Sequence, residues 1–382
     1  MAMLPTLFGW LRKVRPVLRL GSTYLITRHD DVRTVFANDQ AFGAPYAAKL
    51  DIIMGGAPFI LGMADGDPYR AGLASLRRVV RRDDLPLLGA RVTAQAEAIV
   101  AEADGRLDVV DTLVRRIAFD FMATYLGVPE PANGELRVWG TRLFEFQFVA
   151  SDAPLLAEVN RIAPLMRAHV QQQIEARRGS SGDDVIARAL RLQAAGEPGF
   201  SDTQIRSDVV GLLVGGPPQP PMVLPQALEQ LLRRPDALAA AQAAARADDD
   251  RLLSAYIMEA MRFDPLAPWM PRVARAARSV GEGKSGRIIP AGATVLASIA
   301  SAMRDERRVP DPSRFDATRP AEQYLHFGYG VHQCFGLEIN RATLHLMLKP
   351  LLKRDRLRRA PGRAGRLQKN GAFASSLVVE FD

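Results

Sequence analysis

The chain's only cysteine lies in the stretch Phe327-Gly328-Tyr329-Gly330-Val331-His332-Gln333-Cys334-Phe335-Gly336. Its glycines allow the backbone to turn sharply and to pass close to a flat ligand, against which Phe327 can pack. A helical pattern over residues 337–348 begins directly afterwards. The positive end of that helix favours the thiolate form of Cys334, the form that binds metals. The stretch therefore predicts a metal-binding sulfur, with a buried structural cysteine as the alternative.

The spacing of these residues resembles the cytochrome P450 signature Phe-x-x-Gly-x-x-x-Cys-x-Gly. Its four fixed positions are matched by Phe327, Gly330, Cys334 and Gly336. The resemblance implies an oxidoreductase that holds haem b (iron protoporphyrin IX). It also implies that Cys334 is the thiolate ligand of the haem iron, within a cytochrome P450-like fold that is mainly α-helical with a minor β portion.

Composition and charge favour a soluble protein that is not exported. The chain has 382 residues, 48% of them hydrophobic, and no apolar run approaches the roughly 18 residues that span a bilayer. A lone cysteine forms no internal disulfide and residues 1–20 lack a signal-peptide pattern, so we expect a cytoplasmic protein. The net charge of +8 comes from arginines spread along the chain, which argues against nucleic acid as a partner.

The pattern along the chain predicts one large α-rich domain over residues 1–382. Apolar residues recur at helical spacing through residues 69–188. Further helices are expected over residues 30–37, 209–214, 228–233, 237–247 and 252–263. The expected strands are residues 23–27, 287–289, 294–296 and 375–381. These strands are too few and too scattered for a wound parallel sheet.

Two residues of the predicted helix over residues 252–263 are spaced for an ion pair. Glu259 and Arg262 lie three apart and share a face, which alone is typical of a solvated surface pair. Their order and distance from the cysteine loop resemble the Glu-x-x-Arg pair of the P450 family. Arg314, in Asp-Pro-Ser-Arg-Phe-Asp, resembles the third member of that family's structural triad. The resemblance implies a scaffold that fixes the haem loop.

The two haem propionates need cations or hydrogen-bond donors in a largely apolar pocket. Arg272 and His332 resemble the family's propionate partners. The family's other contact is a His-x-x-x-Arg pair on an early helix, and here Tyr69 and Leu73 stand in its place. A tyrosine hydroxyl still donates to a carboxylate, and Arg70 or Arg77 can supply charge.

The central helix departs from the family pattern Ala/Gly-Gly-x-Asp/Glu-Thr. The comparable stretch is Gly215-Gly216-Pro217-Pro218-Gln219-Pro220-Pro221, so Pro218 replaces the acid and Gln219 replaces the alcohol. An interior proline costs about 3 kcal/mol in a regular helix, so we expect the helix to open here. The alternative interpretation is a connecting loop without a catalytic role.

The loss of the acid and alcohol bears on the oxidant, because in the family this pair delivers protons to bound dioxygen. A peroxide arrives already reduced, and haem-thiolate iron splits it without an electron donor. Gln219, beside Gly215 and Gly216, could bind the peroxide. This resembles the amide residues of allene oxide synthases and of the haem-thiolate halves of fatty-acid diol synthases. The alternative is a conventional monooxygenase that takes electrons from a ferredoxin-type donor through an altered proton relay.

The regions that contact substrate in the family contain Leu266, Trp269 and Phe373 here. These bulky apolar residues suit a lipophilic small molecule, or core packing. Two other classes of function stay open at this point. One is a non-catalytic protein that keeps the fold to bind a partner. The other is a thiol hydrolase that uses Cys334 with His332 or His326 as its base.

Overall fold

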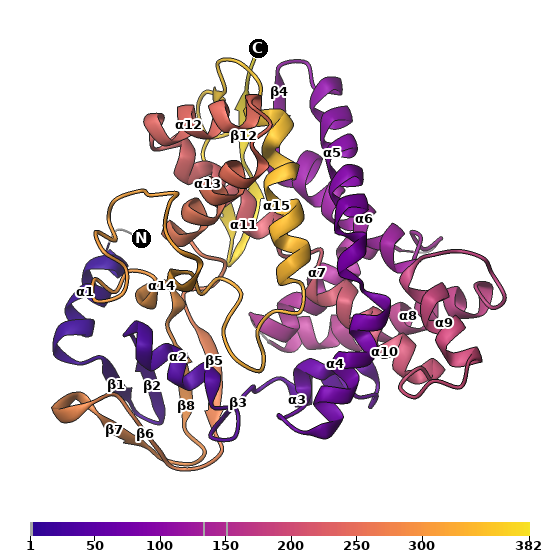
Figure 1. The fold of residues 1–382 in the computed structure, drawn as a ribbon, viewed down its shortest axis with the longest axis horizontal. Coiled ribbons are helices and arrows are strands. Elements are labelled where there is room, and N and C mark those ends of the chain that lie inside the picture. Colours follow the sequence, from indigo (N-terminus) through magenta and orange to yellow (C-terminus); the bar gives the residue numbers. More distant parts are fainter. Residues whose placement is uncertain (1–2, 133, 150–151) are drawn as a thin grey trace. The chain divides into compact units, whose positions relative to one another are not determined.

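The computed structural model describes residues 3–132, 134–149 and 152–382 (Figure 1). Helices hold 55% and strands 11% of the chain, which confirms the expected mainly α fold with a minor β portion. The chain divides into a first unit, Met1–Pro45 with Gln226–Leu337, and a second unit, Tyr46–Pro225 with Glu338–Asp382. The single domain over residues 1–382 stays a prediction. No helix of the described ranges is both long and apolar enough to cross a bilayer.

The first unit contains the largest β-sheet, in the strand order β1-β2-β8-β5-β3. The pairing of β2 with β8 is parallel and the other pairings are antiparallel. The strands are β1 (Val17–Leu20), β2 (Thr23–Ile26), β8 (Thr294–Ala297), β5 (Met270–Ala274) and β3 (Phe42–Gly43), with a separate hairpin of β6 (Arg278–Val280) and β7 (Arg287–Ile289). The helices are α1 (Met3–Val14), α2 (His29–Ala37), α12 (Pro235–Arg246), α13 (Asp250–Phe263), α14 (Ile299–Ala302) and most of α11 (Pro220–Leu232), with the short turns η4 (Gly283–Ser285) and η5 (Ala321–Gln323).

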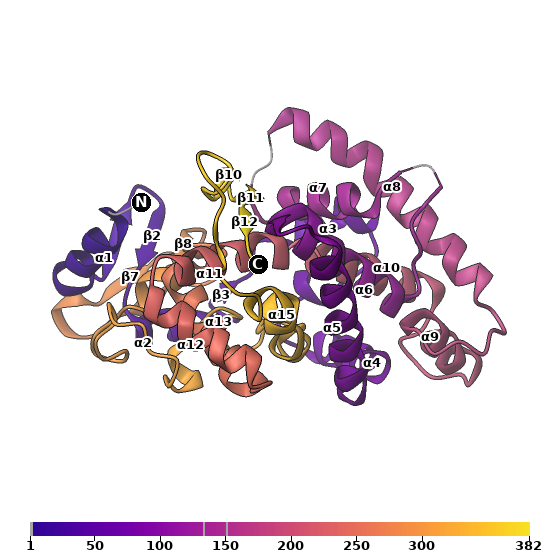
Figure 2. The same cartoon turned by 90° about the horizontal axis from the view of Figure 1, so that it is seen from above.

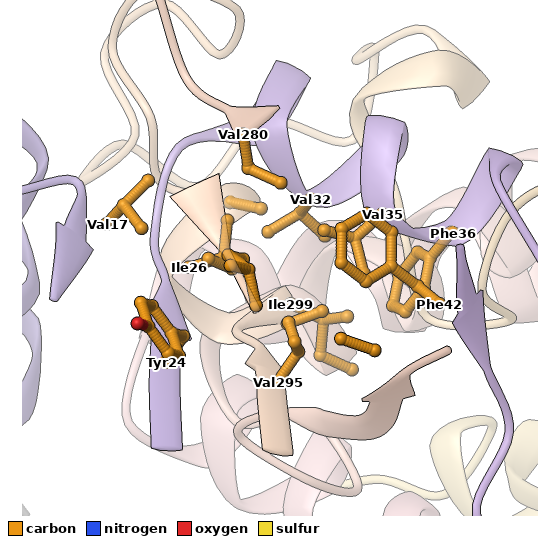
Figure 3. Close-up of a cluster of buried hydrophobic side chains, with 14 of the residues drawn as sticks. Val17, Tyr24, Ile26, Val32, Val35, Phe36, Phe42, Val280, Val295 and Ile299 are labelled. Carbon is orange, nitrogen blue, oxygen red and sulfur yellow. The ribbon is translucent and has the colours of Figure 1, made fainter. Parts of the chain in front are cut away.

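A hydrophobic core joins α2 to this sheet (Figure 3). Alternation along β2 points Ile26 into the core, and Val295 of β8 joins it from the neighbouring strand. The helix contributes Val32, Val35 and Phe36, at the i, i+3 and i+4 spacing of one helical face. This packing fixes the C-terminal end of α2 and the turn that follows it.

The second unit is mainly helical. Its helices are α3 (Ala47–Met54), α4 (Asp67–Val79), α5 (Leu85–Glu102), α6 (Arg116–Leu126), α7 (Leu136–Phe148), α8 (Ala153–Ala176), α9 (Val185–Ala194), α10 (Asp202–Gly215) and α15 (Leu337–Leu352), with the π-helix η3 (Val109–Arg115) and the short turns η1 (Ile60–Gly62) and η2 (Arg82–Asp84). The helices α7 and α8 lie side by side, and both pack against α10 (Figure 2). The strands β4 (Arg106–Asp108), β12 (Val378–Glu380) and β9 (Arg358–Arg359) form one antiparallel sheet, and β10 (Gln368–Asn370) pairs with β11 (Phe373–Ser376).

The structure changes two boundaries that the sequence predicted. The expected strand over residues 375–381 is divided, because β11 pairs with β10 whereas β12 pairs with β4 and β9. The helix expected over residues 228–233 begins eight residues earlier, at Pro220. Proline suits the first turn of a helix, where the missing N–H has no intrahelical partner. The prolines at 220 and 221 therefore begin a helix.

Candidate functional site

The cysteine loop precedes α15 and is closed by backbone hydrogen bonds. The N–H of Cys334 donates to the carbonyl of Phe327 at 2.8 Å, and the N–H of Gln333 donates to that of Gly330 at 3.1 Å. Gly330 has a φ of 76°, and a Cβ there would lie 2.7 Å from the carbonyl oxygen of Phe36. Only glycine therefore allows this loop to pack against the end of α2.

The environment of the sulfur sets the protonation of Cys334. The residue is partly exposed, yet burial raises the pKa of its thiol, and the Gly336 backbone N–H that bonds the sulfur acts in the opposite direction. Of these two effects on the pKa of Cys334, burial is the larger. A metal ion that binds the sulfur displaces the proton and supplies the missing positive charge.

These residues fit a haem. Within the described ranges, no three His, Cys, Asp or Glu side chains are placed to hold a metal ion together. A haem would supply the remaining ligands of its own iron, so a single thiolate from the chain suffices.

Both predicted propionate partners of the first unit are buried, with polar neighbours. Arg272 lies in β5, donates to the carbonyl of Pro271 at 2.9 Å, and places its guanidinium 4.8 Å from the ring centre of Phe36. His332 places Nε2 3.1 Å from a carboxylate oxygen of Asp39, which also pairs with Arg275 at 3.3 Å. Burial lowers the pKa of His332, and Asp39 opposes that shift.

The ion pair of α13 is fully buried. Arg262 donates to both carboxylate oxygens of Glu259, at 2.8 and 2.7 Å, and neither side chain is exposed (0% and 0%). Arg262 also donates to the carbonyls of Met303, Pro312 and Arg314. The alternative of a solvated surface pair is therefore wrong. The pair pins the irregular chain between α14 and the cysteine loop onto α13.

The third cation of this cluster is Arg319, which corrects the expectation for Arg314. Arg319 is 4% exposed and its Nε donates to Glu259 at 3.2 Å. The Arg314 side chain is 67% exposed and pairs with Asp316 at 2.7 Å, so Arg314 contributes only its backbone carbonyl. Both arginines lie in a segment without helix or strand period, so no sequence signal separates them.

The central helix opens where the prolines begin. α10 ends at Gly215 and α11 begins at Pro220, and the N–H of Gly216 donates to Leu212 at 2.9 Å. The side-chain amide of Gln219 donates to the carbonyl of Gly215, and its backbone N–H donates to Gly216 at 3.2 Å. A Cβ placed on Gly215 would meet no described atom within 4 Å. There is open space beside Gly215, and Gln219 caps the helix end.

The remaining predicted site residues are distributed over both units. Tyr69 is buried in the first turn of α4, whereas Arg70 is exposed and pairs with Asp65 and Asp67, and Arg77 is also exposed. In the first unit, Trp269 is 37% exposed and Leu266 is partly buried.

Phe373 lies in β11 of the second unit, within an aromatic cluster that sequence reasoning did not predict. Its ring packs edge to face on Phe144 of α7, with the ring centres 6.2 Å apart. Phe144 contacts Phe148, which contacts Tyr46. The cluster draws on three distant segments, and only the fold brings them together.

The sequence analysis also did not predict two buried polar side chains of the second unit, Asp208 and Gln147. Asp208 of α10 is 8% exposed and accepts a hydrogen bond from Gln204 at 2.8 Å; burial raises its pKa to about 7. Gln147 of α7 is 2% exposed, and neither of its amide atoms has a hydrogen-bond partner among the described residues. Such groups are rare in protein interiors. Asp208 precedes Gly215 by two helical turns, about 10 Å along α10.

The model of the family Cytochrome P450 matches residues 147–376. The chain belongs to the cytochrome P450 family. Cytochrome P450 monooxygenase PikC of Streptomyces venezuelae is 29% identical over 87% of this chain and 77% of that protein. Erythromycin C-12 hydroxylase of Saccharopolyspora erythraea is 29% identical over 91% and 85%.

The fold agrees with this assignment. The ligand-free structure of cytochrome P450 TbtJ1 superposes with a TM-score of 0.84 at 24% identity, and covers 100% of this chain and 98% of that one. A P450 is an oxidoreductase with haem b as its cofactor. Membership of this family argues against the two other classes of function, a thiol hydrolase and a non-catalytic protein.

The correction from Arg314 to Arg319 can be tested by paired substitutions. We expect Arg319→Gln to destabilise the protein by about 3–5 kcal/mol, because it leaves part of a buried ion cluster unpaired. The matched variant Arg314→Gln should change stability little, since its side chain is mostly exposed. Thermal unfolding of the haem-loaded proteins measures both, and equal losses in the two variants would contradict the correction.

Asp208 should make stability depend on pH. Its folded pKa of about 7 lies above the ordinary value of 3.8, so the folded state loses stability as the pH rises between these values. Each pKa unit corresponds to about 1.4 kcal/mol. We therefore expect Asp208→Asn to raise the melting temperature, and to raise it more at about pH 8 than at about pH 5.

Asp202, in the first turn of the same helix, provides a control of opposite sign. Hydrogen bonds from Gln193 and Arg178 lower its pKa, so its stabilising effect is present at neutral pH and is lost in acid. Asp202→Asn should therefore destabilise the protein at neutral pH, and less so in acid. A pH-independent effect of Asp208→Asn would show that the carboxyl does not titrate with folding.

Proposed function

We propose that this P450 uses a peroxide or hydroperoxide to oxidise, or to rearrange, a lipophilic small molecule. The observation that carries the proposal is the helix break of residues 216–219, where Pro218 and Gln219 take the places of the family's acid and alcohol. Pro218 carries no titratable group, and the Gln219 amide has no proton to relay at neutral pH. A reaction without external electrons suits such a site. With hydrogen peroxide the balance is RH + H₂O₂ → ROH + H₂O, and a hydroperoxide rearranges to an isomer.

The cofactor assignments follow from the residues that match the family's signature and its propionate partners. We assign Cys334 as the iron ligand, with Phe327, Gly330 and Gly336 shaping the loop around it. Bound haem b supplies the electron-transfer chemistry that splits an O–O bond. Arg272 and His332 of the first unit and Tyr69 of the second are assigned to the propionates. Their burial supports this, because a carboxylate in an apolar site needs charged or hydroxyl donors.

The residues assigned to the oxidant and the substrate are those at the positions that the family uses for them. Gly215 has open space beside it, Gly216 turns the chain, and Gln219 holds the turn. We assign Phe373, in its aromatic cluster, and Trp269 and Leu266 to substrate contacts. These residues suit contact with a lipophilic molecule.

A second candidate is a conventional monooxygenase that receives electrons from a ferredoxin-type donor. The names of its relatives, a monooxygenase and a hydroxylase, favour it. The buried carboxyl of Asp208 on α10 offers an acid for an altered proton relay.

The haem ligand and the oxidant are tested in one series. We expect the reduced protein under carbon monoxide to show a thiolate-ligated band that is absent from Cys334→Ala. We expect peroxide to support turnover without any reductase. Turnover that requires ferredoxin and NAD(P)H, with no reaction from peroxide, would restore the conventional monooxygenase. An identical spectrum in Cys334→Ala would remove the haem assignment itself.

The role of Gln219 is tested separately by Gln219→Leu. Loss of the amide should slow peroxide consumption by roughly tenfold or more, on the scale of removing one positioned donor. Gln193→Leu is the matched control, because that amide also donates to a backbone carbonyl, that of Phe200 at 2.7 Å. Unchanged peroxide kinetics in Gln219→Leu, or the same loss in both variants, would remove Gln219 from the site.

A further inference from the structure

The carboxylate of Asp39 joins two segments that carry the assigned haem partners. Asp39 follows the C-terminal end of α2, and its side chain is 1% exposed. One oxygen lies 3.1 Å from Nε2 of His332, in the cysteine loop. The other accepts from Nη1 of Arg275 at 3.3 Å, directly after β5. One buried group thus contacts both the loop of Cys334 and the end of the strand that carries Arg272.

The turn that presents Asp39 is held rigidly. The N–H of Phe42 donates to the carbonyl of Asn38 at 2.8 Å, and the N–H of Arg275 donates to that of Ala41 at 2.7 Å. The strands β3 and β5 pair through Gly43 and Val273. A Cβ on Gly43 would lie 2.1 Å from Nε of Arg275, so glycine leaves room for that guanidinium beside Asp39.

Asp39 supplies a negative charge among cationic side chains. Arg272 and Arg275 bring two positive charges close to His332, and a haem would add two negative propionates. The contact with Asp39 sets how the His332 ring is turned. Contact with a fixed carboxylate orients an imidazole in this way at metal sites, where such partners tune affinity and potential.

We propose that Asp39 is a positioning residue for the haem, acting through His332. It fixes the imidazole ring and the spacing between the cysteine loop and the Arg272 strand, so that the propionates meet donors already in place. This inference rests on the proposed function, in which Cys334 binds haem. The competing role is a buried ion pair that stabilises the fold alone.

The test compares Asp39→Asn with Asp305→Asn. Asp305 is also buried, at 2% exposed, and accepts from Arg307 and from the backbone N–H of His29 at 2.9 Å. His29 begins α2 and Asp39 follows its end, so the two carboxylates lie at opposite ends of this helix. Both variants should lower the melting temperature, which measures the structural role.

Only Asp39→Asn should change the haem. Transfer of haem to excess apomyoglobin should become roughly tenfold faster, the size expected for a lost outer-shell partner. The reduction potential should shift to more positive values, because a negative charge near the iron is removed. Equal haem-loss rates and potentials in Asp39→Asn and Asp305→Asn would overturn the proposal.

A double-mutant cycle tests the route through His332. His332→Gln alone should accelerate haem loss, and adding Asp39→Asn should bring little further change. Additive effects, or an unchanged rate in His332→Gln, would show that Asp39 does not act through this ring. If Asp39→Asn fails to fold, Asp39→Glu, which keeps the charge but moves the carboxylate, should also accelerate haem loss, and an unchanged rate in that variant would overturn the proposal. Loss of the haem assignment is recognised separately, by haem binding with an identical spectrum in Cys334→Ala.

Discussion

The buried pair of Glu259 and Arg262 is the interaction on which the cysteine loop depends. Two charges with no exposure to water are tolerated only when hydrogen bonds satisfy them fully. Glu259 accepts from Arg262, Arg319, the Tyr324 hydroxyl and the backbone N–H of Asp316. Arg262 also donates hydrogen bonds to the backbone carbonyls of residues 303, 312 and 314. These hydrogen bonds hold in place the segment between α14 and the cysteine loop, which has almost no regular secondary structure.

That path leads directly into the loop of Cys334. His326 places Nε2 3.0 Å from the carbonyl of Met258, one residue before Glu259. Beyond it, Gly330 packs on the end of α2 and His332 meets Asp39. The loop is therefore held from α13 on one side and from α2 on the other. A ligand sulfur has to be held in this way, because a metal bond tolerates displacements of only a few tenths of an ångström.

Sequence reasoning succeeded where the signal is carried by neighbouring residues. The signature around Cys334, the helix over Glu259 and Arg262 and the strand at residues 23–27 all depend on short spacings. It failed where the fold alone decides. Arg314 and Arg319 lie five residues apart in an irregular segment, so only the structure shows which guanidinium is buried. Asp39 and His332 are 293 residues apart, and no local pattern pairs them. Pro220 was read as part of a break, although proline is also a good first residue of a helix.

The hydrogen bonds of Gln219 explain why the helix breaks after Gly215. In a continuous α-helix the carbonyl of Gly215 would accept from the backbone N–H of Gln219, four residues on. Here that N–H turns to Gly216, and the side-chain amide of the same residue takes its place at Gly215. Threonine, the family's residue at this position, could offer the same carbonyl only a hydroxyl donor. The prolines and Gln219 therefore belong to one local structure. The residues that replace the family's acid and alcohol are therefore the ones that hold this break together.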